Sequence, residues 1–593
     1  MEIDVEKNPT KIKTNINKIK TKIKSNIEQI HYELKDAAPW YKYYEQLEIP
    51  KNIDYPKNTM YEVVEMTAKK YPENYAYEYF SKKVTYFEFI EKIERCAKSL
   101  QAIGVKEDSI VTLCMPNTPE GIIMFYACNM IGAVANMVHP LSSETEIEFC
   151  LNKAKSSHLL TMDFVYEKIY KIKDRVNLKK VILTSAADSM GVVTSIGYWV
   201  KAGRKIKVTN QQDNVIRWKD FIYLGRNIKE VNATRKRDRD LAVILYSGGT
   251  TGIPKGIMLS NSNFNVIAYQ HHKVCHSVKP GESMLCIMPI FHGFGLGICF
   301  HTVLTAGMKA IIIPKFTPGE FGKLIKTYQP NFIAGVPTLY EALLNTEIKE
   351  DGLEFLTTIL CGGDMLTPEL QKKVNNFLKE HGCKSEIRVG YGMTECVASS
   401  VASPTGNLIP GSIGIPNPDN YVKIVKPGTT ENLYYEDDGE ICISGPSVMM
   451  GYLDDPKETK NTLKTHEDGR IWLHTGDMGC MDKTGVVYFK TRIKRMIISS
   501  GYNIYPNHVE NVINSHPKVL TSIVVGVPHP YKGEVAKAYV VLKPEYKGND
   551  KIDAEIMEHC KTNLAKYSWP TSIEYRETLP VTKLGKADYR NVK

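Results

Sequence analysis

The chain has 593 residues, of which 43% are hydrophobic and 24% charged, with a formal net charge of +10 at pH 7. This length exceeds a single ordinary core and the composition is that of a globular protein, so we expect at least two domains. The modest positive charge suits anionic ligands, and we expect no nucleic-acid partner. The 13 cysteines form no CxxC pair, which argues against a zinc site and favours a reducing, cytoplasmic location.

Residues 1–40 predict a basic amphipathic N-terminal extension. Isoleucines recur there at steps of four and three, with lysines between them. Three arrangements fit such a helix: packing on its own domain, pairing with a second helix, or a peripheral membrane contact through residues 10–34. We expect neither a secretory signal nor a membrane-spanning helix.

Strand-like and helix-like segments then alternate over most of the chain. Strands at 109–115 and 132–138 each precede a helix, at 118–131 and 144–154, and the same rhythm continues from 283 to 389. This alternation predicts an α/β fold with parallel-rich sheets covered on both faces. Short segments between 413 and 490 predict a small β subdomain within a large domain over residues 41–490. Residues 491–593 predict a smaller α+β domain.

A glycine-rich loop lies between predicted strands at 241–246 and 256–259. Its backbone N–H groups and hydroxyls suit phosphate oxygens, and its lysine adds positive charge. A Gly follows that lysine where the Walker pattern requires Ser or Thr, so a strand–loop–strand phosphate cradle fits better than a P-loop; a surface hairpin without a ligand is the alternative. The candidate phosphate-binding residues are Ser247, Gly248, Gly249, Thr250, Thr251, Gly252 and Lys255.

The sequence YSGGTTGIPKG at 246–256 resembles the signature loop of the adenylate-forming (AMP-binding) superfamily, and further motifs of that family follow in order. The likeness is greatest to the acyl-CoA synthetase branch. It implies that the loop holds the β- and γ-phosphates of ATP and that the C-terminal domain is a mobile lid.

The resemblance also implies residue roles. Gly363, Asp364, Tyr391 and Gly392 would surround the adenine, while Asp477 would accept the ribose hydroxyls with help from Arg492. Glu395 would hold Mg²⁺, and Thr394 would contact the α-phosphate. Lys586 would reach the α-phosphate and the substrate carboxylate, and His292 of the FHGFG motif completes the catalytic set.

The last domain carries further family positions. Lys494 stands at the hinge, and Ser500, Gly501 and Tyr502 would line the coenzyme A tunnel. Two residues depart from the family pattern: Thr491 replaces a usual Gly or Asp, and Ile498 replaces a lysine found in some aryl-CoA ligases.

These assignments predict ATP-dependent formation of an acyl-AMP from a small-molecule carboxylic acid, followed by transfer to coenzyme A. No acidic residue lies near the FHGFG motif to hold an ammonium group, so a medium- or long-chain fatty acid is favoured over an amino acid. Gly293, Phe294, Gly335 and Val336 would border the acyl pocket, with the glycines leaving room. Three alternatives stay open: an aryl- or bulky-acid CoA ligase, an enzyme that loads an acyl-carrier protein, and a non-catalytic nucleotide-binding regulator. The oligomeric state is not predicted.

Overall fold

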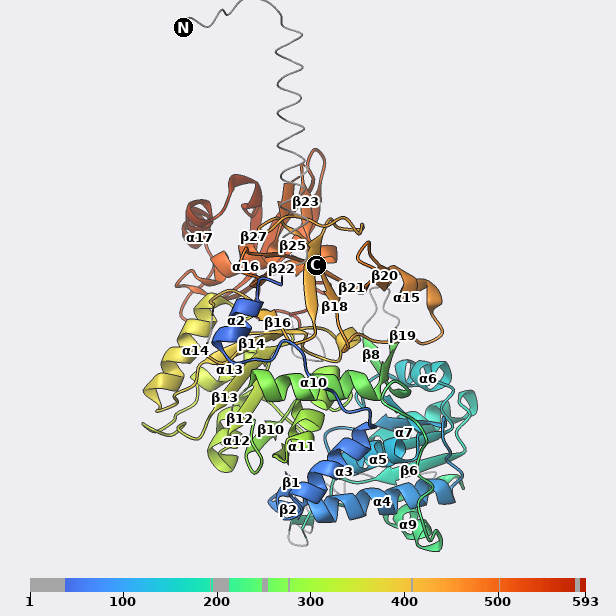
Figure 1. Cartoon of the computed structure of the whole chain (residues 1–593). Helices are drawn as coiled ribbons and strands as arrows, with labels where there is room; N and C mark the ends of the chain where they lie inside the picture. Colours follow the sequence, from blue (N-terminus) through green and yellow to red (C-terminus); the bar gives the residue numbers. More distant parts are fainter. Residues whose placement is uncertain are drawn as a thin grey trace, which may run out of the picture.

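The computed structural model describes residues 38–191, 194–195, 213–247, 254–275, 278–406, 409–500, 502–581 and 587–592. Within these ranges the strands form four sheets, two large and two small. Figure 1 shows the elements of the two large sheets in the lower part of the molecule, and the elements that follow β23 above them. A small sheet that includes β18 and β21 lies between these two parts (Figure 1).

The first large sheet has nine strands in the order β16-β15-β14-β13-β12-β10-β11-β1-β2. From β14 to β1 neighbouring strands are parallel, and antiparallel pairs lie at both edges. The strands are β1 (Tyr75–Tyr79), β2 (Lys82–Thr85), β10 (Ser283–Cys286), β11 (Lys309–Ile312), β12 (Phe332–Gly335), β13 (Thr358–Gly362), β14 (Ile387–Tyr391), β15 (Val401–Ala402) and β16 (Ile415–Pro416).

The second large sheet has eight strands in the order β19-β9-β8-β4-β3-β5-β6-β7. It is parallel from β8 to β7, whereas β8 and β9 form the antiparallel pair on either side of the predicted phosphate loop. The strands are β3 (Ile110–Cys114), β4 (Val134–Met137), β5 (His158–Met162), β6 (Lys180–Thr184), β7 (Val215–Arg217), β8 (Leu241–Ser247), β9 (Lys255–Ser260) and β19 (Gly451–Tyr452).

Two small sheets follow in the sequence. The first contains β17 (Tyr421–Val425), β18 (Gly439–Ser444), β20 (Leu463–Thr465), β21 (Ile471–Met481) and β22 (Val487–Arg492). The second contains β23 (Ile497–Ser499), β24 (Tyr502–Ile504), β25 (Val519–His529), β26 (Gly533–Leu542) and β27 (Ser572–Tyr575).

Side-chain caps begin many of the helices. Thr59, Thr85, Ser143 and Ser260 each form a capping box at the start of α3, α4, α6 and α10. The α-helices are α2 (Tyr41–Gln46), α3 (Met60–Lys70), α4 (Tyr86–Ala102), α5 (Pro119–Met130), α6 (Glu144–Lys153), α7 (Tyr166–Ile172), α9 (Trp218–Leu224), α10 (Asn261–Val274), α11 (Val303–Thr305), α12 (Phe321–Tyr328), α13 (Pro337–Leu344), α14 (Pro368–Glu380), α15 (Pro456–Thr462), α16 (Pro506–Asn514) and α17 (Asp550–Asn563). Short 3₁₀ turns are η1 (Asp163–Val165), η2 (Lys173–Arg175), η4 (Gly225–Asn227), η6 (Pro318–Glu320), η7 (Thr394–Cys396), η8 (Ile493–Arg495) and η9 (Lys566–Ser568), and η5 (Phe294–Thr302) is a π-helix.

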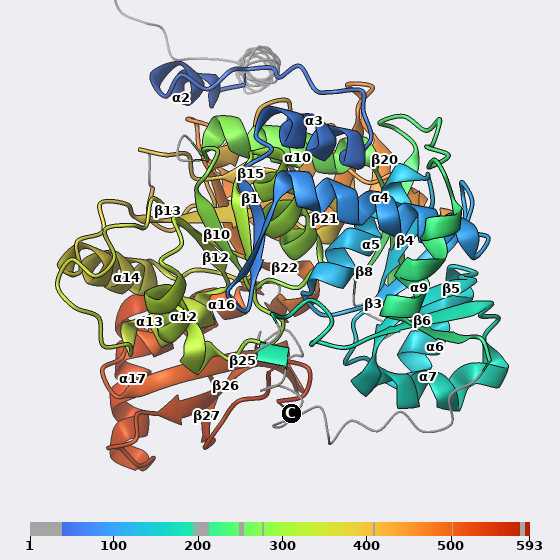
Figure 2. The same ribbon diagram turned by 90° about the horizontal axis from the view of Figure 1, so that it is seen from below.

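Helices α4 and α5 form a layer between the two large sheets. α4 contacts β1 and β2 of the nine-stranded sheet, whereas α5 contacts β3 and β4 of the eight-stranded sheet. Every residue of α5 is buried, as expected for a helix enclosed on all sides. Figure 2 shows α4 and α5 on one side of the eight-stranded sheet and α6 and α7 on the other. One hydrophobic core therefore extends across both sheets.

The predicted fold class is confirmed, and most predicted elements occur within a few residues of their predicted bounds. Helix α12 starts at Phe321 after a 3₁₀ turn, and α16 starts at Pro506, because proline favours the first turn of a helix. The apolar segment after residue 293 forms the π-helix η5, which the sequence did not predict. In the described ranges, no helix combines the length and apolar character needed to cross a membrane.

Candidate active site

The carboxyl ends of β13 and β14 place two predicted adenine-binding segments next to each other. These strands pair in parallel up to their ends, so Gly363 and Tyr391 emerge at the same edge of the sheet, where α/β proteins commonly bind ligands. Gly363 has φ +80°, a conformation that favours glycine. A Cβ atom on Gly392 would lie 2.0 Å from the Ala398 carbonyl oxygen, so this position also requires glycine.

Glu395 is buried at the centre of the candidate site. The 3₁₀ turn η7 carries it, with Thr394, just beyond β14, and its side chain is in contact with two other segments. Its Oε1 accepts a hydrogen bond from Ser247 Oγ at 3.3 Å and another from the Tyr452 hydroxyl at 2.9 Å. Burial raises the pKa of Glu395 above the usual value for glutamate, although these hydrogen bonds act in the opposite direction. The contacts bring the start of the phosphate loop to the predicted magnesium ligand.

Asp477 lies between an aromatic and a basic residue. The Tyr391 hydroxyl donates a hydrogen bond to Asp477 Oδ2 at 2.9 Å, and Arg492 Nε lies 3.5 Å from Oδ1. Asp477 and Arg492 are directly opposite each other on β21 and β22. Asp477 is 4% exposed, whereas the Arg492 side chain is 56% exposed. The negative charge of Asp477 raises the pKa of Arg492, and burial raises the pKa of Tyr391.

Lys255 lies at the start of β9, immediately after the predicted phosphate loop. Its ammonium group forms an ion pair with Glu458 of α15 and lies 5.0 Å from the centre of the Tyr452 ring. The hydrogen bond from Lys255 lowers the pKa of Glu458, despite partial burial. In this state of the protein, the lysine predicted to bind phosphate is therefore paired with a carboxylate.

Val397 directly follows η7 and has a strained backbone conformation. Its φ of +69° and ψ of −55° are rare for a β-branched residue, and Ala398 N donates to Cys396 O at 2.9 Å, which makes a γ-turn. A Cβ atom on Gly293 would lie 1.6 Å from the Val397 carbonyl oxygen. One on Gly297 would lie 2.7 Å from the Val397 side chain.

This packing corrects the interpretation of the glycines near the predicted acyl pocket. The sequence suggested that Gly293 and Gly335 leave room for a ligand. Instead, Gly293 packs against the main chain of Val397, and a Cβ atom on Gly335 would lie 2.4 Å from the Leu339 side chain. Contact with main-chain atoms therefore accounts for Gly293, whereas at Gly335 the neighbouring atom is the end of a flexible side chain. Whether this segment borders the acid stays a prediction.

The other predicted acyl-side residues lie at element boundaries. His292 Nδ1 accepts a hydrogen bond from the backbone N–H of Phe294 at 3.3 Å, just before the π-helix. Phe294 packs against the main core, and Val336 precedes the first turn of α13.

The C-terminal elements approach the site through α16. Arg495, which follows the predicted hinge residue Lys494 in η8, forms a buried ion pair with Glu510 of α16. Burial raises the pKa of Glu510, and the charge of Asp364 contributes to this increase. Tyr505 also donates a hydrogen bond to Asp438 Oδ2 at 2.9 Å.

Two predicted coenzyme A residues lie on the hairpin of β23 and β24. Ser500 has φ +51°, and its N–H donates to Lys532 O at 2.8 Å. Tyr502 is 57% exposed and stacks on Tyr567, with 4.9 Å between the ring centres. Ile498, which departs from the family pattern, is 52% exposed on the same hairpin.

Several predicted site residues lie outside the described residues: Gly248, Gly249, Thr250, Thr251, Gly252, Gly501 and Lys586, together with the predicted helix at 10–34. Conversely, the structure adds contacts that sequence reasoning missed. Tyr452 contacts Glu395, and Glu458 contacts Lys255. Both pairs are far apart in the sequence, and no local sequence pattern signals such contacts.

Comparison with known proteins agrees with this geometry. The family model described as "AMP-binding enzyme" matches residues 64–453, and that of the "AMP-binding enzyme C-terminal domain" matches residues 508–586. A long-chain-fatty-acid–CoA ligase of Bacillus subtilis (strain 168) is 33% identical over 561 residues, covering 93% of this chain and 97% of that protein. One from Haemophilus influenzae is 30% identical and covers 88% of this chain and 92% of that protein.

Solved structures share the fold. ATP-bound MatB from Rhodopseudomonas palustris has a TM-score of 0.76 at 24% identity, covering 89% of this chain and 97% of that one. A benzoate CoA ligase from Burkholderia xenovorans LB400 has a TM-score of 0.75 at 20% identity, covering 90% of this chain and 100% of that one. The family match over most of the chain and the 33% identity show that this protein belongs to the AMP-binding enzyme family.

Proposed function

We propose that this protein is an AMP-forming acyl-CoA synthetase that activates a medium- or long-chain fatty acid. A carboxylate attacks the α-phosphorus of ATP, giving acyl-AMP and pyrophosphate, and the thiol of coenzyme A then displaces AMP. The observation that carries the proposal is the contact of buried Glu395 with Ser247, which joins the phosphate loop to the predicted adenylate site. The fatty-acid assignment is supported by the names of the relatives.

The residues around Glu395 fit a magnesium ion. Mg²⁺ in nucleotide sites is held by one or two carboxylates and by substrate phosphates. Glu395 is buried, and its raised pKa reflects the cost of a desolvated negative charge that a cation would offset. When bound, Mg²⁺ would neutralise negative charge on the ATP phosphates.

The remaining residues would bind and orient the nucleotide. Asp477 is proposed to accept hydrogen bonds from the ribose hydroxyls, and the positive charge of Arg492 stabilises its carboxylate. The ring of Tyr391, which also contacts Asp477, is proposed to stack on the adenine. Residues 248–252 and Lys255 are proposed to hold the β- and γ-phosphates. Thr394 and Lys586 are proposed to act at the α-phosphate, where fixed positive charge stabilises the transition state by several kcal/mol.

The acid and thiol sides of the site complete the proposal. His292, Gly293, Phe294, Gly335 and Val336 are proposed to border the acid. Lys494 is proposed as the hinge about which residues 491–593 rotate relative to residues 41–490, so that Ser500, Gly501 and Tyr502 line the path of coenzyme A. Limited proteolysis with cleavage near the hinge would support this domain division.

Pyrophosphate release with a panel of acids, with and without coenzyme A, tests the proposal. Fatty acids should trigger release in the wild type, Lys586→Ala should abolish it, and the control Lys583→Ala should retain it. Formation of acyl-CoA supports the acceptor assignment, whereas release without a thioester indicates a carrier-protein acceptor. Faster turnover of aryl acids than of fatty acids would contradict the fatty-acid assignment. If no acid triggers pyrophosphate release, the proposed enzymatic activity is contradicted.

A peripheral membrane contact through residues 10–34 is a separate proposal, supported by the basic amphipathic pattern alone. Flotation with anionic vesicles tests it. The full chain should float and a chain lacking residues 1–37 should not; equal behaviour would contradict the contact.

A further inference from the structure

A two-residue irregularity between β18 and β21 presents Asp477 to the site. Cys442 pairs with His474, whereas the next pair joins Glu440 to Met478, so two steps on β18 correspond to four on β21. Such bulges disrupt the ladder and redirect a side chain, and they are frequent beside active sites. Here Gly476 takes φ +70° within the bulge, and Asp477 directly follows it.

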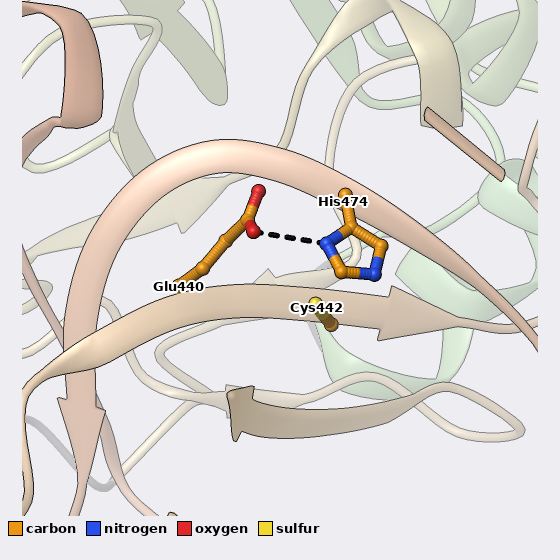
Figure 3. Close-up of side chains that lie close together, drawn as sticks. All are labelled: Glu440, Cys442 and His474. Atoms are coloured by element: carbon orange, nitrogen blue, oxygen red, sulfur yellow. Dashed lines mark hydrogen bonds and ion pairs between the residues drawn. The ribbon is translucent and has the colours of Figure 1, made fainter. Parts of the chain in front are cut away.

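The carboxylate of Glu440 occupies the gap that the bulge leaves in the ladder. Its Oε1 accepts a hydrogen bond from the Gly476 backbone N–H at 3.0 Å, and its Oε2 lies 2.9 Å from His474 Nδ1. Figure 3 shows the carboxylate pointing at the His474 ring. Glu440 and His474 are 6% and 8% exposed. Both ends of the bulge are therefore held by one buried side chain.

The chemistry of this contact fixes the protons of two histidines. A carboxylate only accepts, so His474 carries a proton on Nδ1 and, when neutral, presents a lone pair on Nε2. His466 Nε2 lies 2.9 Å from that atom, and when His474 is neutral His466 is the donor of this hydrogen bond. Burial lowers the pKa of His466 to about 4, which keeps it neutral. Burial alone would raise the pKa of Glu440, but the hydrogen bonds from His474 and Gly476 lower it below its usual value.

Hydrogen bonds of Thr475 connect the bulge to Asp477. Thr475 Oγ1 donates to the Ile441 carbonyl at 2.7 Å and accepts from the Asp477 N–H at 3.1 Å. The chain of contacts thus runs from Glu440 through the bulge to the carboxylate that Tyr391 and Arg492 contact.

We propose that Glu440 is a positioning residue that holds the bulge in the one conformation in which Asp477 accepts the ribose hydroxyls of the nucleotide. The inference rests on the proposed function, because it takes Asp477 as the ribose acceptor. In this role Glu440 acts through its hydrogen bonds with the Gly476 turn and with His474, and not by binding the nucleotide itself.

A metal site is the other arrangement to weigh, because ligand atoms of Glu440, Cys442 and His474 all lie within 4.8 Å of one another. Figure 3 shows the Cys442 sulfur beside the other two side chains. Both oxygens of Glu440 already accept N–H hydrogen bonds, and burial raises the pKa of the Cys442 thiol well above its usual value. These contacts favour a hydrogen-bonded network over a metal site. A metal site would need the Cys442 sulfur as a ligand, whereas the hydrogen-bonded network does not involve Cys442.

The test compares the binding of AMP and 2′,3′-dideoxy-AMP, which lacks both ribose hydroxyls, to the full chain by calorimetry. A glutamine at position 440 cannot accept from both the Gly476 N–H and His474 Nδ1–H, because one end of its amide is a donor. We expect Glu440→Gln to weaken AMP binding about tenfold, the loss of one good hydrogen bond, and to change the binding of 2′,3′-dideoxy-AMP little, because that nucleotide lacks both hydroxyls. The ratio of the two affinities, which is the preference for the ribose hydroxyls, therefore falls towards one.

The matched control is Cys442→Ala, on the same face of β18, which should keep the wild-type preference. A loss of preference in this control would overturn the inference in favour of a metal site. Equal weakening of both nucleotides in Glu440→Gln, or an unchanged preference, would also overturn it. Glu440→Asp, which retains the charge but reaches less far, provides a second variant if the glutamine variant does not fold, and it should show an intermediate loss.

The outcomes separate this inference from the proposed function. Acid-dependent pyrophosphate release by the wild type, with an unchanged preference in Glu440→Gln, contradicts the inference alone. Wild-type protein that binds AMP and 2′,3′-dideoxy-AMP equally contradicts the ribose role of Asp477, and the inference fails with it.

Discussion

Asp477 and Arg492 face each other across β21 and β22, with Oδ1 and Nε 3.5 Å apart. The carboxylate is buried while much of the arginine side chain is exposed, so the arginine forms the solvent side of the pair. Asp477→Asn should raise the KM for ATP about 10- to 100-fold, because hydrogen bonds to a charged acceptor are worth about 1.5–3 kcal/mol. Initial-rate kinetics would measure this. Glu431→Gln, at an exposed position of the same small sheet region, should leave KM unchanged; equal values for Asp477→Asn and the wild type would contradict the ribose role.

In the absence of ligands, the Glu395→Gln variant should become more stable than the wild type as the pH rises. Burial raises the pKa of Glu395, so the folded state holds its proton more tightly than the unfolded state. The free energy of unfolding therefore decreases as the pH rises from the usual glutamate pKa through the raised value, and glutamine removes this dependence. Melting temperatures of both proteins at pH 5 and pH 7.5, without nucleotide or Mg²⁺, measure the effect.

The same variant should lose activity even though it gains stability. Glutamine retains an acceptor for Ser247 and Tyr452 but not the charge proposed to hold Mg²⁺, so kcat/KM should fall about 100-fold or more. A variant with a lower melting temperature than the wild type at high pH, or with full activity, would contradict the proposal that the buried charge of Glu395 serves to bind Mg²⁺.

Glu458→Gln should lower the KM for ATP. In the structure Glu458 is paired with Lys255, which is proposed to bind phosphate, so the nucleotide must compete for the lysine. Partly exposed ion pairs contribute about 0.2–1 kcal/mol, which corresponds to a decrease of about two- to fivefold at most. The decrease should be smaller at high salt. An increased KM would instead indicate that Glu458 orients Lys255 for the phosphate.

At Val397 a glycine substitution should destabilise the protein less than an alanine substitution, the reverse of the usual order. Inside a helix or strand, glycine destabilises a protein by about 0.5–1 kcal/mol relative to alanine, but Val397 has φ +69°, where any Cβ atom is strained. Both substitutions remove the two γ-methyl groups of Val397, and they then differ in the Cβ atom, which only alanine retains. Val397→Gly should therefore unfold at a higher denaturant concentration than Val397→Ala; the opposite order would show that the turn is not strained.

The sequence predicts the elements well where local signals are strong. The helices predicted at 118–131 and 144–154 are α5 and α6, which begin at Pro119 and after the capping Ser143, because proline and capping serine mark helix starts. Gly363, Tyr391 and Glu395, which the resemblance assigns to the nucleotide site, follow the ends of β13 and β14 at one edge of the sheet, and their roles stay predictions.

What could not be predicted depends on contacts between distant segments. Tyr452 donates to Glu395 from 57 residues away, and neither residue's neighbours encode that contact. Gly293 was interpreted as free space because a sequence shows a missing side chain but not the Val397 carbonyl that takes its place. The bulge at Gly476 depends on Glu440, on another strand, and so escapes any local pattern.

The hydrogen bonds to Glu395 also join the two large sheets, because Ser247 and Tyr452 belong to the eight-stranded sheet and Glu395 follows β14 of the nine-stranded sheet. Ser247 precedes Glu395 by 148 residues, and Tyr452 follows it by 57. A nascent chain that has not yet emerged beyond β19 can pair β8 with β9, but it lacks the hydroxyl that completes the surroundings of this carboxylate. Because long-range contacts slow folding, we expect the proposed nucleotide pocket to be complete only in a chain whose two large sheets have already joined.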